Sequence, residues 1–493
     1  MAKATFTGPA AAGIITPAQQ KMALSSNYLD FRSNDVFGDS TNISGWAQQY
    51  LPDLYEQEVD RYGNRTISGF LAMLSAEIPM QSDQVVWSEQ GRLHLAYTGE
   101  INPTNGTIDL IKNIDTAAKE QHAVRPNSTV VAIVNDIVFK AIVTSTTTNT
   151  TDSDLSTVVI RPYTAEHVDD IAGIAATDNQ AIKFFVYGSE YAKGTDSPGE
   201  SIEANFTSFS NRPMIIKDEF EVSGSDTAQI GWVEVTGESG QGGYLWYLKS
   251  AGDTRSRFND YLEMSMVEAE KAAGTNVFSS VTNAPQGTEG LFAAIENRGI
   301  VATDVVDSAS DALADFDLLL AELDKQGAIE ENMLYLDRAS NLVFDDMLGQ
   351  ISVGNQGGTA YGVFENSEDM ALNLGFTGFR RGSYDFYKTD WKYLNDASTR
   401  GHITKANGDG EIKGVLIPAG TSSVYDQMVG ANVRRPFLHV RYRASQTDDR
   451  KLKSWVTGSV GGPTSSQLDA MQINFLSERC LVVQAANNFV LLK

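Results

Sequence analysis

The chain has 493 residues, of which 42% are hydrophobic and 20% charged, a composition typical of a folded protein with about two to four hydrophobic cores. Its 63 acidic and 38 basic residues give a net charge of −25, which repels nucleic-acid phosphates and anionic membranes unless basic residues cluster locally. No apolar run reaches the roughly 18 residues of a transmembrane helix, and the N-terminal sequence lacks a signal-peptide pattern. We therefore expect a chain that folds in a cytoplasm and has no membrane partner.

The N-terminal part predicts an arm followed by a helix. Residues 1–45 are rich in Ala, Gly, Ser, Thr, Asn and Gln, and they predict an extended arm held in place by other subunits. In residues 46–77 apolar side chains recur at three- and four-residue spacings, as at Leu51, Leu54 and Tyr55, which predicts a helix.

Two β-rich regions come next. Residues 85–165 hold short β-branched runs separated by turn-forming sequences such as residues 102–106, and they predict a small barrel or sandwich inserted into a larger domain. In residues 188–240, strands around 214–216 and 230–235 predict a long two-stranded hairpin. Because an isolated hairpin is marginally stable in water, we expect this one to rest on another part of the protein.

The clearest helical pattern covers residues 253–273. Asp253 is suited to cap its start, Gly274 is suited to end it, and a helix of this length spans roughly 30 Å. Its predicted buried face consists of Phe258, Leu262, Met266, Ala269 and Ala273.

The C-terminal half mixes helices and strands. Residues 308–325 predict a helix, and the strand predicted at 332–336 is followed by a helix at 338–348. Strands are predicted at 479–484 and 488–492, and a chain that finishes on an apolar strand usually has that strand inside a sheet. The fold class is therefore α+β.

The residues that carry enzymatic chemistry are scattered. The glycine-rich loops at 237–243 and 354–358 fit neither the Walker spacing nor GxGxxG, and acidic neighbours such as Asp448 and Asp449 are expected by chance among 63 acids. A single cysteine, Cys480, excludes a disulfide and a thiolate zinc site, and we expect a small buried hydrophobe there. We predict no catalytic residues, no metal and no cofactor. The histidines, each expected to be an ordinary surface or interface residue, are His94, His122, His167, His402 and His439.

One segment reverses the local charge. Arg434, Arg435, Arg441 and Arg443 begin a basic stretch that ends at Lys453. One interpretation is a groove for phosphates, and the other is a set of ion pairs to an acidic neighbouring copy of the chain. The net charge of −25 favours the second, because the planar fork of arginine suits interface carboxylates. These four arginines are our candidate inter-subunit contacts.

Two stretches carry a family resemblance. Residues 209–224, followed by the helix from residue 253, resemble the far strand of the E-loop and the spine helix of tailed-bacteriophage major capsid proteins of the Hong Kong 97 type. The sequence from 415–420 through 440–443 to 478–487 is similar to the C-terminal ends of that family, in which a Glu-containing strand closes the sheet. The inserted β module is typical of larger capsid proteins, such as those of crAss-like phages.

This resemblance implies the Hong Kong 97-type capsid fold and divides the chain into seven parts. They are an N-terminal arm (1–45), the start of the peripheral domain (46–84), an inserted β domain (85–165), an E-loop region (166–240), the peripheral domain with its spine helix (241–300), an axial domain (301–440) and C-terminal strands returning to the peripheral domain (441–493).

The resemblance also implies the function and the partners. Copies would assemble in the host bacterial cytoplasm into hexamers and pentamers of an icosahedral head, and the virion would enclose double-stranded DNA without sequence-specific binding. Auxiliary or decoration, portal and scaffolding proteins are the other implied partners. The first two alternatives are a phage tail or baseplate protein, and a secreted glycan-binding adhesin, which six Asn-x-Ser/Thr sequons would suit. An encapsulin-like nanocompartment and a hydrolase with carboxylate chemistry come after them.

Overall fold

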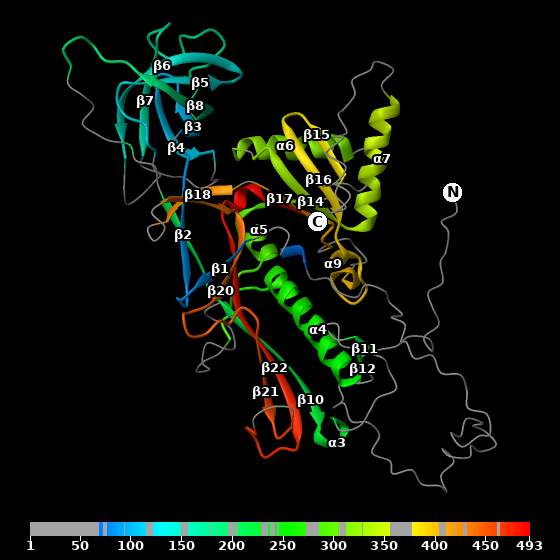
Figure 1. Cartoon of the computed structure of the whole chain (residues 1–493). Coiled ribbons are helices and arrows are strands. Elements are labelled where there is room, and N and C mark those ends of the chain that lie inside the picture. Colours follow the sequence, from blue (N-terminus) through cyan, green and yellow to red (C-terminus); the bar gives the residue numbers. More distant parts are fainter. Residues whose placement is uncertain are drawn as a thin grey trace. The chain divides into compact units, whose positions relative to one another are not determined.

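The computed structural model shows two compact units, each with its own hydrophobic core (Figure 1). One comprises the described parts of Met1–Val86 and Ser210–Lys493, and the other those of Trp87–Phe209. The predicted arm and residues 46–68 of the predicted helix lie outside the described residues. The described residues are 69–71, 76–92, 94–114, 122–148, 156–177, 179–195, 202, 206–227, 235–236, 242–243, 246–272, 285–303, 305, 312–327, 329–354, 377–403, 411–419, 421–426, 431–460 and 464–493.

The second unit is a closed barrel of antiparallel strands in the order β3-β4-β7-β6-β5-β8. Side chains alternate between its interior and its surface: in β8, Ile182 and Phe184 are buried, whereas Lys183 and Phe185 are exposed. The strands are β3 Ala96–Asn102, β4 Thr107–Asn113, β5 Ser128–Val134, β6 Ile137–Thr147, β7 Thr157–Pro162 and β8 Gln180–Ser189.

The barrel extends beyond the predicted end of the β module at residue 165. Its sixth strand, β8, lies in residues 166–240, the range that the resemblance assigned to the E-loop region. β8 closes the barrel because it pairs with both β3 and β5. Both partners are more than 40 residues away along the chain, so no local pattern in the sequence reveals the pairing.

Gly106, in the β3–β4 turn, occupies a position that only glycine fits. Its φ is 74°, and a Cβ atom would lie 2.2 Å from the carbonyl oxygen of Ile160. Gly194 of the same unit has a φ of 80°, but a Cβ there meets nothing within 4 Å. Gly106→Ala is expected to cost about 2 kcal/mol more than Gly194→Ala, which introduces only backbone strain of about 1 kcal/mol. Hydrogen exchange of barrel peptides measures both losses, and equal losses would contradict the role of the close approach.

His122 and His439 are 7% and 1% exposed, so the prediction that both are surface or interface residues is wrong. His122 Nε2 lies 3.2 Å from the carbonyl oxygen of Thr157, and His439 Nδ1 lies 3.2 Å from that of Pro436. Backbone partners therefore allow both imidazoles to be buried. His94 and His402 are exposed, as expected.

Acid is expected to destabilise the barrel through His122. Burial lowers the pKa of His122 below its ordinary value of 6.5, although the hydrogen bond to Thr157 opposes the shift. The unfolded state therefore binds a proton on His122 more readily than the folded state does. The stabilisation that comes from burying the neutral imidazole is complete above pH 6.5 and is lost as the pH falls below that value. Hydrogen exchange of barrel peptides should show more opening at pH 5.5 than at pH 7. His122→Gln should reduce this difference, and an unchanged difference would contradict the assignment.

The chain enters and leaves the barrel through two paired strands. β2, Val85–Gln90, and β9, Phe206–Asn211, form a two-stranded sheet. Within it the rings of Trp87 and Phe209 lie 6.2 Å apart between centroids, and the hydroxyls of Ser88 and Ser208 lie 3.3 Å apart.

The first unit contains a five-stranded sheet centred on β22, Ala470–Val483. β22 pairs antiparallel with β10, Met214–Ser223, along one edge and with β20, Leu438–Arg443, and β21, Lys453–Gly458, along the other. β1, Ala76–Met80, lies parallel beside β20. The end of the predicted helix at residues 76–77 is therefore strand, since these residues pair with β20.

The predicted hairpin is confirmed only in its first strand. β10 confirms a strand at residues 214–216 and pairs with β22, whereas residues 230–234 of the second predicted strand lie outside the described residues. Val235–Thr236 forms β11, which pairs with β12, Gly242–Gly243. The alternating pattern of β10 suits any antiparallel partner, so it cannot select one.

A long helix packs on this sheet. α4, Trp246–Glu268, lies along β10 and β22 in Figure 1, and its buried Phe258 and Leu262 pack against Phe475 of β22. The predicted buried face is confirmed at Phe258, Leu262 and Met266. Asp253 lies inside the helix, so its predicted role as the cap is wrong, because the helix begins one to two turns earlier than the apolar pattern indicated.

A six-stranded sheet has the order β13-β23-β17-β14-β16-β15. Helices α6, Ala312–Lys325, and α7, Arg338–Gly354, share its core through Phe316 and Phe344, whose rings meet edge to face. The predicted placement of the last strand inside a sheet is confirmed, because β23 lies between β13 and β17. The strands are β13 Ile300–Ala302, β14 Glu331–Leu336, β15 Thr377–Arg381, β16 Tyr384–Asp390, β17 Gly414–Pro418 and β23 Val490–Leu492.

Shorter elements complete the described part of this unit. Among the described residues, no helix combines the length and the apolar character needed to span a bilayer. The remaining elements are α3 Gly224–Thr227, α5 Leu291–Arg298, α9 Lys392–Asn395, the 3-10 helices η3 Arg400–His402 and η4 Ala486–Asn488, and the paired strands β18 Thr421–Asp426 and β19 Ala431–Pro436.

Candidate functional site

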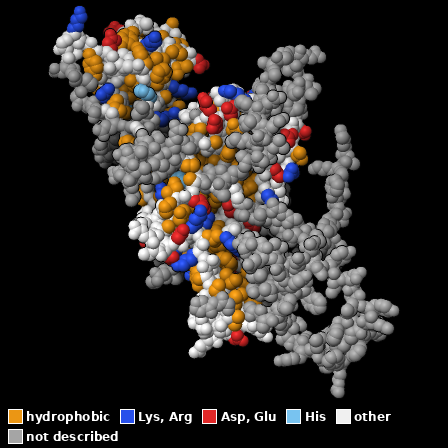
Figure 2. Space-filling model, viewed as in Figure 1, with side chains coloured by type: hydrophobic (Ala, Val, Ile, Leu, Met, Phe, Trp, Pro, Cys, Tyr) orange, Lys and Arg blue, Asp and Glu red, His pale blue; other side chains and the backbone are white. Residues whose placement is uncertain are grey.

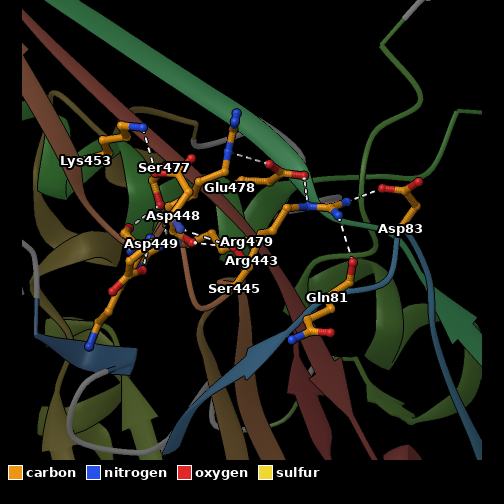
Figure 3. Close-up of polar contacts among 12 residues, drawn as sticks. Gln81, Asp83, Arg443, Ser445, Asp448, Asp449, Lys453, Ser477, Glu478 and Arg479 are labelled. Carbon is orange, nitrogen blue, oxygen red and sulfur yellow. Dashed lines mark hydrogen bonds and ion pairs between the residues drawn. The ribbon is translucent and has the colours of Figure 1, made fainter.

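The basic segment after β20 meets a buried carboxylate of β22. Glu478, whose side chain is 8% exposed, accepts a hydrogen bond from Arg443 Nε through Oε1 at 2.7 Å (Figure 3). Its Oε2 lies 2.8 Å from Arg450 Nε. The amide of Glu478 also donates to the carbonyl of Arg450 at 3.0 Å. One buried carboxylate thus holds two arginines, and the loop between β20 and β21 is tied to the central strand.

Arg443 also connects the sheet to the turn after β1. Its guanidinium pairs with Asp83 and donates to the carbonyl of Gln81 at 2.9 Å (Figure 3). Burial by itself lowers the pKa of Arg443, but Asp83 and Glu478 together outweigh burial and raise it. The side chain is therefore fixed as a cation that joins three separate segments.

A second pair of basic residues meets Glu77 of β1. Lys451 and Arg479 both lie within ion-pair distance of its carboxylate, with Arg479 Nη1 at 3.7 Å. Arg479 is buried and donates to Ser477 Oγ and to the carbonyl of Lys451, each at 2.9 Å. Burial lowers the pKa of Arg479, and the nearby Glu77 and Glu263 oppose this shift.

Glu263 links α4 to the turn at residues 69–71. Its two carboxylate oxygens accept hydrogen bonds from the backbone amides of Gly69 and Leu71 at 3.0 and 3.1 Å. Burial raises the pKa of Glu263, against the effect of these two hydrogen bonds. The long helix is thereby joined to the chain just before β1 as well as to the sheet.

A polar hollow of about 680 Å³ lies beside this network. Two arginines and one aspartate line it, together with uncharged polar side chains. Its lining residues are Gln81, Arg443, Ala444, Ser445, Gln446, Thr447, Asp448 and Arg450.

The four predicted arginines occupy two different strands. Arg441 and Arg443 lie on β20, where Arg441 Nη1 is 3.5 Å from the carbonyl of Pro79. Arg434 and Arg435 lie on β19, opposite Ser423 and Ser422 of β18. The structure therefore places Arg443 in the ion network, Arg441 on the same strand beside the carbonyl of Pro79, and Arg434 and Arg435 in a separate two-stranded sheet.

Sequence reasoning missed the acidic partners of Arg443 within the same chain. The signal was present in Glu478, a charged residue inside the apolar closing strand, because buried carboxylates are rarely left without a partner. Asn211 was also missed. It is 0% exposed, and its amide group donates to the carbonyls of Glu289 and Leu481.

Cys480 is buried with 0% exposure, which confirms the prediction of a small buried hydrophobe. Burial raises the pKa of its thiol to about 12, although Arg441 has a small opposite effect. The thiol therefore stays protonated and unreactive at neutral pH.

Comparison with known proteins finds similar solved structures but no matching family model and no matching curated protein. The chain is similar to the capsid structure of cyanophage P-SCSP1u, with 8% identity, a TM-score of 0.38, and coverage of 94% of this chain and 98% of that one. The mature capsid of bacteriophage PhiM1 gives 8% identity and a TM-score of 0.38 over 94% and 96% of the two chains. A structure from Mycobacterium phage Ogopogo gives 12% identity and a TM-score of 0.37, with coverage of 90% of this chain and 96% of that one.

Proposed function

We propose that this chain is a major capsid protein of a tailed bacteriophage. The observation that carries the proposal is α4 lying along a sheet whose strands come from distant parts of the chain, namely β1, β10 and β22. This arrangement fits the peripheral domain with a spine helix that the resemblance implies. Because one fold can host many functions, the support for the capsid function comes from the order in which these parts follow one another along the chain.

The remaining parts take family roles in the same proposal. The paired strands β2 and β9 correspond to the E-loop, and the barrel is an insertion between them. The six-stranded sheet with α6 and α7 corresponds to the axial domain. The E-loop is thus assigned to the paired strands on either side of the barrel and not to residues 214–235.

The proposed partners are copies of the same chain. Copies would assemble in the host cytoplasm into hexamers and pentamers of an icosahedral shell, with Arg434, Arg435, Arg441 and Arg443 as candidate contacts. The net charge of −25 would keep packaged DNA from adhering to the shell. The proposal includes no catalysis and no cofactor.

Sedimentation of the expressed chain tests this proposal. We expect material at the mass of hexamers, six times 53.6 kDa, or at the much larger mass of closed particles. A stable monomer at micromolar concentration that binds glycans would contradict the capsid function and support an adhesin.

A further inference from the structure

The outer face of the barrel carries an apolar patch framed by lysines, here called the barrel patch. Val138 is 64% exposed and Phe185 47%, and both lysines of the patch are also exposed. Tyr187, 51% exposed, lies two residues beyond Phe185. Figure 2 shows hydrophobic side chains at the surface of the barrel with Lys and Arg among them. The barrel patch consists of Val131, Ile133, Val138, Lys140, Lys183 and Phe185.

The strand register arranges these six residues in two rows across β6, β5 and β8. Val138 pairs with Ile133, which pairs with Lys183; Lys140 pairs with Val131, which pairs with Phe185. Directly opposed side chains in such rows lie about 5 Å apart, so each lysine borders the apolar centre. None of the six positions is acidic, although the chain carries 63 acidic and 38 basic residues.

The closed barrel restricts how this surface can be used. All six strands are paired on both sides, so no strand can be added at an edge, and contact must come through side chains. An apolar centre with a basic rim fits a partner with an apolar centre and an acidic rim.

Helix α6 presents such a complementary surface. Leu318 is 67% exposed, and Asp315 and Glu322 lie three residues before it and four after it, on the same helix face. Glu322 remains 50% exposed although it pairs with Lys325. Ala314 and Ala321, both exposed, leave room for a partner beside Leu318.

We propose that the barrel patch of one copy binds the α6 face of a second copy of this chain. Lys140 and Lys183 then pair with the carboxylates of α6, and Leu318 packs between Val138 and Phe185. The contact is small, below the roughly 1,200 Å² of a stable interface, so it acts through repetition over many copies. In that respect it rests on the proposed capsid function.

Photocrosslinking from Phe185 tests the contact directly. Phe185 is replaced by p-benzoylphenylalanine in the full chain, and assembled material is irradiated. We expect a product at twice the 53.6 kDa mass of the chain, with the crosslinked peptide containing residues 312–325. A product of monomer mass, a crosslink to another protein, or a crosslink to another region would each overturn the proposal.

Charge reversal provides the second measurement, since exposed lysines can change without loss of the fold. Lys183→Glu in the crosslinking chain should lower the yield about tenfold, and adding Glu322→Lys should restore it. Lys193→Glu, at an exposed lysine of the same unit outside the patch, is the matched control and should leave the yield unchanged. Equal losses in Lys183→Glu and Lys193→Glu would overturn the proposal.

The two proposals fail in different ways. If the wild-type chain forms no capsomers or shells, the capsid function is contradicted. If shells form and neither crosslinking nor charge reversal behaves as described, the capsid function stands and only the barrel contact is wrong.

Discussion

Phe258→Ala is expected to lower the free energy of unfolding of the first unit by about 4 kcal/mol. Phe258 is 0% exposed and stacks on Phe475 with ring centroids 5.8 Å apart, so its loss leaves a cavity between α4 and β22. Among the described residues, this small cluster contains Leu262, Ile216 and Ile473 besides the two rings, so few side chains can move to fill the cavity. Hydrogen exchange of peptides from α4 and β22 measures the effect.

Tyr261→Ala is the matched control on the same helix. Tyr261 is 44% exposed, so its replacement should cost less than about 1 kcal/mol. If the two variants lose similar stability, α4 does not depend on the face that we assign to it. In that case the observation that carries the proposed function would also be lost.

Glu478→Ala is expected to cost about 3 kcal/mol or more, because two arginines would lose the carboxylate that both contact. Arg443 retains Asp83 as a partner, but that side chain is 93% exposed and cannot replace a buried carboxylate. We expect the loop between β20 and β21 to detach first, and faster hydrogen exchange of residues 443–453 would report it.

The control for this prediction is an exposed pair in the same loop. Lys453 Nζ lies 2.6 Å from Asp448 Oδ1, with the two side chains 42% and 40% exposed. Asp448→Ala should therefore change stability by less than about 1 kcal/mol. A Glu478→Ala variant as stable as Asp448→Ala would show that the buried network does not hold the loop.

The sequence predicted the elements whose signal is local. The apolar spacing of Phe258, Leu262 and Met266 identified the buried face of α4, and the β-branched runs identified the barrel module. The strand and helix at residues 332–348 were also found, as β14 and α7. In each case the residues that form the pattern lie within one or two turns or one strand of each other.

Pairing between distant segments could not be predicted in the same way. β10 joins β22 more than 240 residues later, and β8 closes a barrel that begins at β3. The candidate site shows the same limit: Arg443 was identified as an interacting residue, but its partners Asp83 and Glu478 come from other strands and loops. A single sequence shows a charge that needs a partner and does not show which partner the fold supplies.

Electron microscopy of particles formed by the expressed chain tests the central claim most directly. The account predicts closed shells or hexameric capsomers in negative stain, with α4 lying along β10 and β22 in any map that resolves helices. Tubes or baseplate-like assemblies, or a chain that remains monomeric at high concentration, would contradict it.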